Sequence, residues 1–265
     1  MLIDSHCHLD MLAPVKAGGG VDGVLAAAHA AGVAEFLCVG VHPDSQAEML
    51  ELVGDRTGVW CSAGVHPSAE VGSEPDVATI VGWCHDPRII AVGETGLDYH
   101  YVEAVTPERQ RERFRRQVRA ARETGLPLII HTREARADTL AILREERAAE
   151  VGGVFHCFTE DRDTATAAID LGFTVSFSGI LTFRNAAPLR TLARELPLES
   201  LLVETDAPYL APVPMRGKEN EPAFVRHVAE CIARERGVDL DVVASATSAN
   251  FRRTFPRSTG GRRKA

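Results

Sequence analysis

Short runs of apolar and β-branched residues recur along the whole chain, and amphipathic segments of helical length lie between them. The runs span residues 2–9, 35–40, 59–65, 89–96, 127–132, 153–158, 174–179 and 201–206. Segments with helical periodicity include residues 44–54, 107–124, 133–147, 161–171 and 185–195. Strands that alternate with helices predict parallel strands joined by helical crossovers. Several runs are apolar almost throughout, as is typical of strands covered on both faces.

Eight strand–helix units in a chain of 265 residues predict a closed (β/α)8 TIM barrel, an α/β fold. The alternative is an open doubly wound sheet, which usually carries a glycine-rich phosphate loop after an early strand. Neither GxGxxG nor GxxxxGK followed by Ser or Thr comes after any of the runs, so the barrel is favoured. We expect one domain over residues 1–255 and a basic, disordered tail over residues 256–265.

The composition narrows the protein class. The chain is 45% hydrophobic and 25% charged, which is typical of a globular core. No apolar run approaches the roughly 18 residues of a membrane helix, and no signal segment begins the chain, so we expect a cytoplasmic protein and favour a monomer. The net charge of −8 argues against a general nucleic-acid coat protein. It leaves room for phosphate chemistry at a local site, where bound cations would reverse the sign.

Metal-capable side chains lie at the ends of the predicted strands. In HCHLD, His6 and His8 are one residue apart, so a strand would direct both imidazoles to the same face. A barrel brings the carboxyl ends of its strands to one mouth. The candidates at such ends are His6, His8, Glu94, His131, His156 and Asp206. Each alone has an ordinary alternative, a histidine bonded to a carbonyl or a carboxylate capping a helix, but the equivalent placement of all six favours a shared metal site.

Four imidazoles and two carboxylates are more than one four-coordinate zinc needs, and they suit two divalent cations with positions open for water. Two such cations require a bridging group, and Glu94 is the expected bridge. Alternation along the strands places Asp4 on the face of His6, and Glu204 on the face of Asp206. Either carboxylate is a candidate to hold the free N–H of a ligand histidine, with packing inside the barrel as the alternative.

Ordered motifs over nearly the whole chain resemble those of the TatD-type deoxyribonucleases, which belong to the amidohydrolase-like hydrolases. The motifs are HCHLD at 6–10, GVHP at 64–67, GETGLDY at 93–99, HTR at 131–133, HCF at 156–158 and ETDAPYL at 204–210. The resemblance implies a (β/α)8 fold, two divalent metal ions, and hydrolysis of DNA, commonly as a 3′ to 5′ exonuclease. Single strands or 3′ ends are the expected substrate. Mg²⁺ is the implied ion for activity, while Zn²⁺ or Mn²⁺ would fit the same nitrogen-rich site.

The resemblance also implies roles for individual residues. His6, His8 and Asp206 would bind one metal, His131 and His156 the other, and Glu94 would bridge them. Asp206 is the candidate general base, which makes Asp206 and Glu94 the expected catalytic residues.

Three further residues are candidates for substrate binding. By resemblance His66 contacts the scissile phosphate, with a structural role before Pro67 as the alternative. In the loop PMRGKENEP, Arg216 and Lys218 follow the eighth strand and are expected to reach phosphate. The arginine-rich segment 109–122 has charges in several helical directions and is interpreted as a solvated outer helix face, not as a track for DNA.

One departure from the family pattern bears on the substrate. Many relatives have a small residue soon after HCF, whereas this chain continues with Glu160 and Asp161. Acids at the mouth would repel DNA, but capping of the next helix is the favoured interpretation. The ligand residues do not separate a nuclease from a same-fold hydrolase that cleaves an ester or amide in a small or nucleic-acid-linked substrate. A noncatalytic metal-binding scaffold is least supported, because it would need neither Glu94 nor Asp206.

Overall fold

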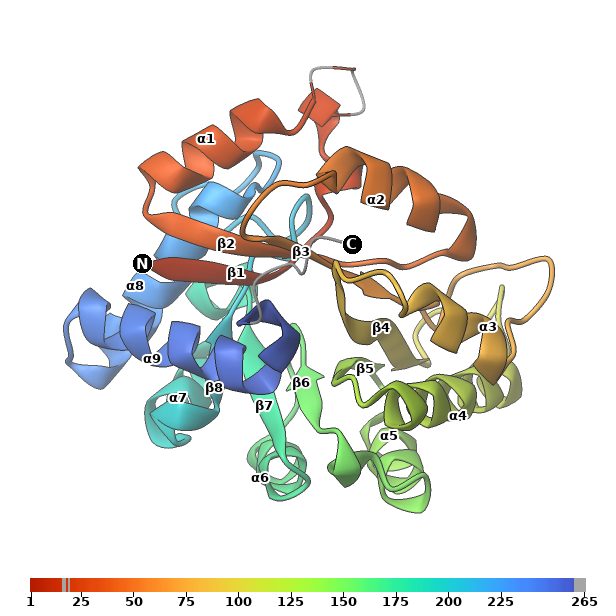
Figure 1. Cartoon of the computed structure of the whole chain (residues 1–265). Coiled ribbons are helices and arrows are strands. Elements are labelled where there is room, and N and C mark those ends of the chain that lie inside the picture. The colour runs from red at the N-terminus through yellow and green to blue at the C-terminus, as the bar shows by residue number, and fades with distance from the viewer. Residues whose placement is uncertain (16–17, 19, 260–265) are drawn as a thin grey trace.

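Eight parallel strands form one sheet that curves into a barrel, and helices surround it (Figure 1). The computed structural model describes residues 1–15, 18 and 20–259. The strands pair in chain order and are β1 (Leu2–Cys7), β2 (Val33–Cys38), β3 (Val59–Ala63), β4 (Ile89–Asp98), β5 (Leu128–Arg133), β6 (Gly153–Phe155), β7 (Phe173–Phe177) and β8 (Leu201–Val203). A parallel bridge between Cys7 and Ala207 joins β1 to the segment after β8. The predicted (β/α)8 barrel is confirmed.

Helices follow the strands around the outside. They are α1 (Asp22–Ala30), α2 (Gln46–Val53), α3 (Val77–Trp83), α4 (Pro107–Thr124), α5 (Arg136–Glu145), α6 (Arg162–Asp170), α7 (Ala187–Glu195), α8 (Val225–Arg236) and α9 (Leu240–Thr254). Short 3-10 helices lie at Leu9–Met11, Pro43–Ser45, Ala148–Glu150, Gly179–Thr182, Leu198–Ser200, Pro222–Phe224 and Pro256–Ser258. The segment predicted at 107–124 matches α4, and the ends of the other four predicted helices lie within three residues of the observed ones.

Six of the predicted strands end two or three residues earlier than expected, and β6 and β8 are each three residues shorter at this end. β6 ends at Phe155 and β8 at Val203, so His156 and Asp206 lie just beyond the regular strands. Cys157 has φ +43° and Asp206 has φ +57°, and a side chain in this left-handed region breaks the alternation of an extended strand. The strict inward and outward alternation expected near these residues therefore does not extend to the mouth.

The core has two layers. The larger apolar cluster fills the space between strands and helices, and a smaller cluster combines residues from seven strands. That combination is possible only in the barrel interior. Phe251 and Phe255, from α9 and the residue that follows it, belong to the inner cluster, and Ser248 donates a hydrogen bond to the Met1 carbonyl. α9 therefore closes the end of the barrel at which the strands begin, opposite the mouth.

The described part of the predicted tail is folded. Pro256–Ser258 forms a 3-10 helix, and Arg257 donates to the carbonyls of Cys84 and Ile89. Residues 260–265 lie outside the described residues. All six cysteines are free thiols, five of them buried. Within the described residues, no helix combines the length and apolar character that a membrane crossing requires.

The arginines of α4 are paired on the outside of the barrel. All seven contact acids of α4 itself or of neighbouring segments. The pairs are Arg109 and Arg113 with Glu74, Arg111 with Glu108 and Asp138, Arg115 and Arg119 with Glu146, Arg116 with Glu112, and Arg122 with Glu150. Their charges are compensated, which agrees with an outer helix face. Arg113 differs from the other six, because its side chain is buried and only 2% exposed.

Glycine at position 96 lets β4 pass close to β5. Gly96 pairs with His131 and has φ +133°, a backbone region that favours glycine. A Cβ atom at this position would lie 1.9 Å from the His131 carbonyl oxygen. The absence of a side chain here therefore sets the distance between β4, which carries Glu94, and β5, which carries His131.

We expect Gly96→Ala to lower the free energy of unfolding by about 1–3 kcal/mol, because the methyl group must displace backbone of a packed sheet. Gly82→Ala is the matched control, since Gly82 lies in α3 with nothing within 4 Å of its would-be Cβ. That change should stabilise by about 0.5–1 kcal/mol, the usual difference between glycine and alanine in a helix. Urea unfolding of both variants measures the effects; equal stability of the two would contradict the close approach.

Candidate functional site

Glu94 is buried in β4 and is surrounded by imidazoles. Its side chain is 4% exposed. Its Oε1 lies 2.8 Å from His156 Nε2, 2.9 Å from His131 Nδ1 and 3.4 Å from His66 Nε2. These three histidines come from three different segments, at the ends of β3, β5 and β6, so one carboxylate oxygen collects groups that are far apart in the chain.

The second oxygen of Glu94 faces the HxH pair. Glu94 Oε2 lies 3.5 Å from His6 Nε2 and 4.0 Å from His8 Nε2, and these two nitrogens are 3.3 Å apart. Asp206 Oδ1 lies 3.7 Å from His6 Nε2 and 3.5 Å from His8 Nε2. The two oxygens of Glu94 therefore face different sets of donors, as a bridging carboxylate requires.

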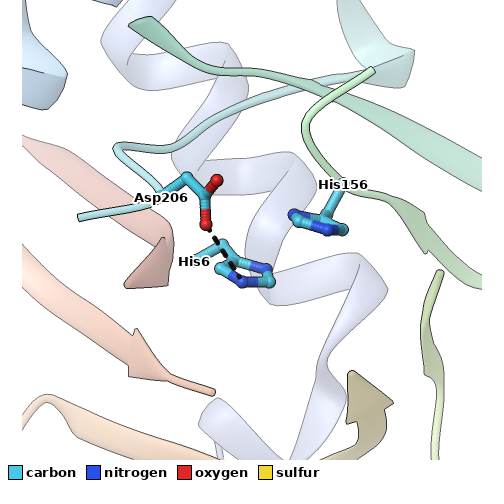
Figure 2. A group of neighbouring side chains, drawn as sticks. All are labelled: His6, His156 and Asp206. Carbon is cyan, nitrogen blue, oxygen red and sulfur yellow. Dashed lines mark ion pairs between the residues drawn. The ribbon is translucent and has the colours of Figure 1, made fainter. Parts of the chain in front are cut away.

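Figure 2 shows how three of these side chains meet: His6 from β1, His156 from the end of β6, and Asp206 from the segment after β8. The rings of His6 and His156 are stacked, with centroids 4.0 Å apart and planes 13° apart. Three groups have ligand atoms within 4.8 Å of one another, namely His6, His156 and Asp206; His6, His8 and Glu94; and His66, Glu94 and His131. The structure thus brings all six candidate ligands together at one mouth.

The outward-facing nitrogens of three of these histidines contact oxygen acceptors. His8 Nδ1 lies 3.0 Å from the Val39 carbonyl, which must accept and so requires the proton on Nδ1. His131 Nε2 lies 3.1 Å from Asp98 Oδ2, and His156 Nδ1 lies 3.3 Å from a Glu204 oxygen. Such contacts orient each ring so that its other nitrogen faces the site, where it would offer a lone pair to a metal ion once deprotonated, as is usual for metal-binding histidines.

Asp98 is absent from the expectations drawn from the sequence. It lies on β4, four residues after Glu94 and two after Gly96. The alternation that identified the other candidates therefore also applies to Asp98. Its second oxygen, Oδ1, accepts from the backbone N–H groups of His100 and Tyr101. Asp98 therefore links the orientation of His131 to the loop that follows β4.

Two carboxylates are expected to contact a histidine ring. Glu204 contacts the ring of His156, whereas Asp4 contacts no histidine ring among the described residues. Glu204 Oε1 contacts His156 and also accepts from the Cys157 N–H at 2.7 Å. Asp4 accepts from the Thr205 N–H at 2.8 Å and from the Thr205 hydroxyl at 2.6 Å. The pairing of β1 with β2 shifts register between Asp4 and Cys7, so alternation from Asp4 fails here. Asp4 instead holds the backbone next to Asp206.

Electrostatics keep both carboxylates ionised. Burial opposes the charge on Glu94, but His156, His66 and the hydrogen bond from His131 outweigh it, so the pKa of Glu94 lies well below its ordinary value. Burial also opposes the charge on Asp206, and the contacts with His8 and His6 lower its pKa. The site thus holds two anions in a buried place, and positive charge is needed there, from imidazole protons or from a divalent cation. The donor set fits such a cation.

His66 differs from the other histidines in the proton it presents. The Ser68 N–H donates to His66 Nδ1 at 3.2 Å, so Nδ1 is an acceptor and the ring proton lies on Nε2. Nε2 faces Glu94 and lines the cavity. Burial lowers the pKa of His66, which favours the neutral ring. His66 therefore directs a donor into the site and not a lone pair.

The His66 loop is held by the buried Arg113 of α4. Arg113 donates to the carbonyls of His66 and Pro67 at 2.7 and 3.0 Å. The same guanidinium donates to both oxygens of Glu74, at 2.6 and 2.9 Å. Burial opposes the charge on Glu74, but Arg113 and Arg109 outweigh it and lower its pKa.

A cavity of about 910 Å³ opens above the cluster. Its lining includes His8, His66, Glu94, His131, His156 and Asp206, together with Tyr101, Arg133 and Tyr209. Neither Arg216 nor Lys218 is among the lining residues. The Arg216 guanidinium lies 4.0 Å from the centroid of the Phe183 ring. The loop after β8 thus turns its arginine onto a neighbouring loop.

Glu160 and Asp161 also lie outside the cavity lining. Asp161 is the N-cap of α6 and accepts from the Thr164 N–H at 2.9 Å. The capping interpretation is confirmed for Asp161. Burial raises the pKa of Glu160, which has no hydrogen bond among the described residues.

Comparison with known proteins agrees with the fold. The model of the family described as TatD related DNase matches residues 3–256. A protein of Escherichia coli named uncharacterized metal-dependent hydrolase YcfH is 52% identical over 258 residues, which cover 96% of this chain and 95% of that protein. A Klebsiella pneumoniae protein named 3′-5′ ssDNA/RNA exonuclease TatD is 35% identical over 247 residues, which cover 91% of this chain and 93% of that protein. The crystal structure of YJJV, a TatD homolog from Escherichia coli, matches with a TM-score of 0.86 at 27% identity, covering 96% of this chain and 98% of that one.

The pair of Glu74 and Arg113 predicts a pH-dependent contribution to stability. A carboxylate whose pKa is lower in the folded state stabilises the fold above its ordinary pKa of 4.5, and this stabilisation is lost as the pH falls through the folded-state value. We expect Glu74→Gln to reduce the free energy of unfolding at pH 7, with a difference from wild type that shrinks below about pH 4.5.

Urea unfolding at several pH values measures this difference. Glu51→Gln is the control, because Glu51 is exposed on α2 and forms no ion pair among the described residues. A difference between wild type and Glu74→Gln that stays constant over the whole pH range would contradict the role of the ion pair.

Proposed function

The chain belongs to the family of TatD-related DNases and is a metal-dependent hydrolase, and from that premise we propose that it degrades single-stranded DNA as a 3′ to 5′ exonuclease. The observation that most supports hydrolysis with two cations is Glu94, whose two oxygens face different sets of nitrogen donors. The Klebsiella relative, named for 3′-5′ exonuclease action on single-stranded DNA and RNA, supports the choice of substrate.

The distances support two cation sites, divided as the family resemblance implies. His6, His8 and Asp206 would hold one cation, His131 and His156 the other, and Glu94 would give one oxygen to each. Mg²⁺ is the proposed ion, and the nitrogen-rich donor set also suits Mn²⁺ or Zn²⁺. When bound, such cations lower the pKa of coordinated water and offset negative charge on phosphate oxygens.

Asp206 is the proposed general base. Its lowered pKa keeps the carboxylate unprotonated near neutral pH, so it is able to accept a proton from an attacking water. Its position is fixed through the backbone, since its N–H donates to the His6 carbonyl at 2.9 Å. Asn220 also donates to the carbonyls of Thr205 and Tyr209, on either side of this segment.

His66 is proposed to donate its Nε2–H to an oxygen of the scissile phosphate. The hydrogen bond from the Ser68 N–H to Nδ1 supports this role over that of a third nitrogen ligand, because a metal ligand needs a lone pair on Nε2. Arg113 would act as a positioning residue, because it fixes the backbone of the His66 loop without reaching the cavity.

A second candidate function is hydrolysis of an ester or amide in a small or nucleic-acid-linked substrate. The size of the cavity favours it, since about 910 Å³ lies within the range of roughly 300–1,000 Å³ that is usual for small-molecule sites. The same carboxylates and imidazoles would serve this reaction, so the substrate has to be tested directly.

We expect Asp206→Asn to lower kcat by about 10²–10⁴-fold, the usual contribution of a general base, while the thermal unfolding midpoint stays close to that of the wild type.

Glu94→Gln should lower both turnover and the affinity for divalent cations, because one charge shared by both sites is removed. Cleavage of 3′-labelled and 5′-labelled single-stranded DNA by magnesium-loaded protein measures turnover, and calorimetric titration with Mn²⁺ measures affinity.

Glu160→Gln is the matched control, since Glu160 is partly buried but lies outside the cavity lining. It should cleave DNA like the wild type. Equal cleavage by wild type and Glu94→Gln would indicate a contaminating nuclease. Wild-type protein that binds the cation and hydrolyses an ester but leaves DNA intact would establish the second candidate in place of the first.

A further inference from the structure

Arg133 is a cation in the cavity that has no anionic partner among the described residues. It is the last residue of β5, two positions beyond His131, and its side chain is exposed. Among the described residues that line the cavity it is the only arginine, and no lysine lines it. No carboxylate in the described part of the chain forms an ion pair with it, whereas nearby Arg136 is paired with Asp161.

Tyr101 lies directly against this cation. The Arg133 guanidinium carbon is 5.1 Å from the centroid of the Tyr101 ring, and the His100 ring meets Tyr101 edge-on at 4.8 Å. Tyr101 nevertheless remains 56% exposed and lines the cavity. Aromatic side chains commonly line ligand-binding cavities, and the Tyr101 ring is one that is open to solvent.

Backbone hydrogen bonds link Arg133 and Tyr101 to the candidate metal site. Arg133 pairs with Asp98 in the β4–β5 ladder, and its carbonyl accepts from the Tyr99 N–H at 3.0 Å. Asp98 Oδ1 accepts from the Tyr101 N–H at 3.3 Å, while Oδ2 contacts His131. The same carboxylate thus positions a candidate metal ligand and the loop that carries the exposed ring.

We propose that Arg133 and Tyr101 form a nucleotide subsite next to the metal centre, in which Arg133 binds a phosphate flanking the scissile one and Tyr101 stacks on a base. The proposal rests on the nuclease function proposed above and deepens it. A guanidinium offers planar, bidentate donors to phosphate, and aromatic stacking accepts every base because each has a π face. A base inside a duplex already has both faces stacked, so this subsite selects single strands and is tolerant of sequence.

Binding to the intact, magnesium-loaded protein tests the subsite separately from turnover. The probe is a 5′-fluorescent single-stranded oligodeoxynucleotide with phosphorothioate linkages that resist hydrolysis, titrated by fluorescence anisotropy at several salt concentrations. Tyr101→Leu should weaken binding by about 5- to 150-fold, the usual range for loss of one stacked base. Tyr101→Phe keeps the ring and should bind like the wild type.

Arg133→Gln should reduce the steepness of the salt dependence as well as the affinity. Each phosphate contact to a single strand contributes about 0.7 to the slope of log K against log salt, so the slope should fall by about that amount. Arg144→Gln is the matched control, because Arg144 is exposed on α5 and does not line the cavity. Its slope should equal that of the wild type, and an unchanged slope in Arg133→Gln would overturn the phosphate contact.

A series of probes with one abasic nucleotide at successive positions tests the stacking. One position should weaken binding to the wild type and to Tyr101→Phe, and should have no effect on Tyr101→Leu, since the partner of the base is already gone. The same penalty in Tyr101→Leu would overturn the stacking contact. Wild-type protein that neither binds nor cleaves any probe would reject the nuclease function itself, whereas cleavage with unaltered binding by both variants would reject the subsite alone.

Discussion

The mouth of the barrel depends on one buried anion. Glu94 is almost fully removed from solvent, and an ionised carboxylate in such a place is strongly unfavourable unless it is paired and hydrogen-bonded. Both of its oxygens meet imidazole nitrogens, and the histidines that supply them come from the ends of four strands. The protonated imidazoles that offset the buried charge could be replaced by divalent cations, so the cluster is suited to bind them.

Hydrogen bonds to the backbone hold the strand ends that carry the metal-capable side chains. Glu94 N–H donates to the Gly40 carbonyl at 2.8 Å, and the Ser62 hydroxyl donates to the Gly93 carbonyl at 2.6 Å, so β4 is tied to the ends of β2 and β3 at the position of the carboxylate. On the opposite side, Thr205 is held by Asp4. Polar residues next to the donors therefore fix the rim, and the donors themselves are left facing the cavity.

The sequence predicts the barrel and the convergence of the six donors because both depend on local patterns, namely apolar runs and the positions of polar residues at their ends. Alternation fails at Asp4, where the strand shifts register, and it does not reach Asp206, whose φ is positive. Asp98 follows the same period, but one acid among 37 acidic residues gives no indication of its partner. Whether an arginine forms an ion pair depends on the tertiary structure. The sequence therefore does not separate Arg133 from the other arginines, and its prediction that Arg216 reaches the cavity is wrong.

Anomalous X-ray diffraction from crystals soaked in Mn²⁺ would show whether Glu94 bridges two cations. Data collected at the manganese absorption edge should contain two peaks about 3.5–4 Å apart, one on each oxygen of Glu94. A single peak, or two peaks that leave Glu94 without a metal contact, would show that Glu94 does not bridge two cations.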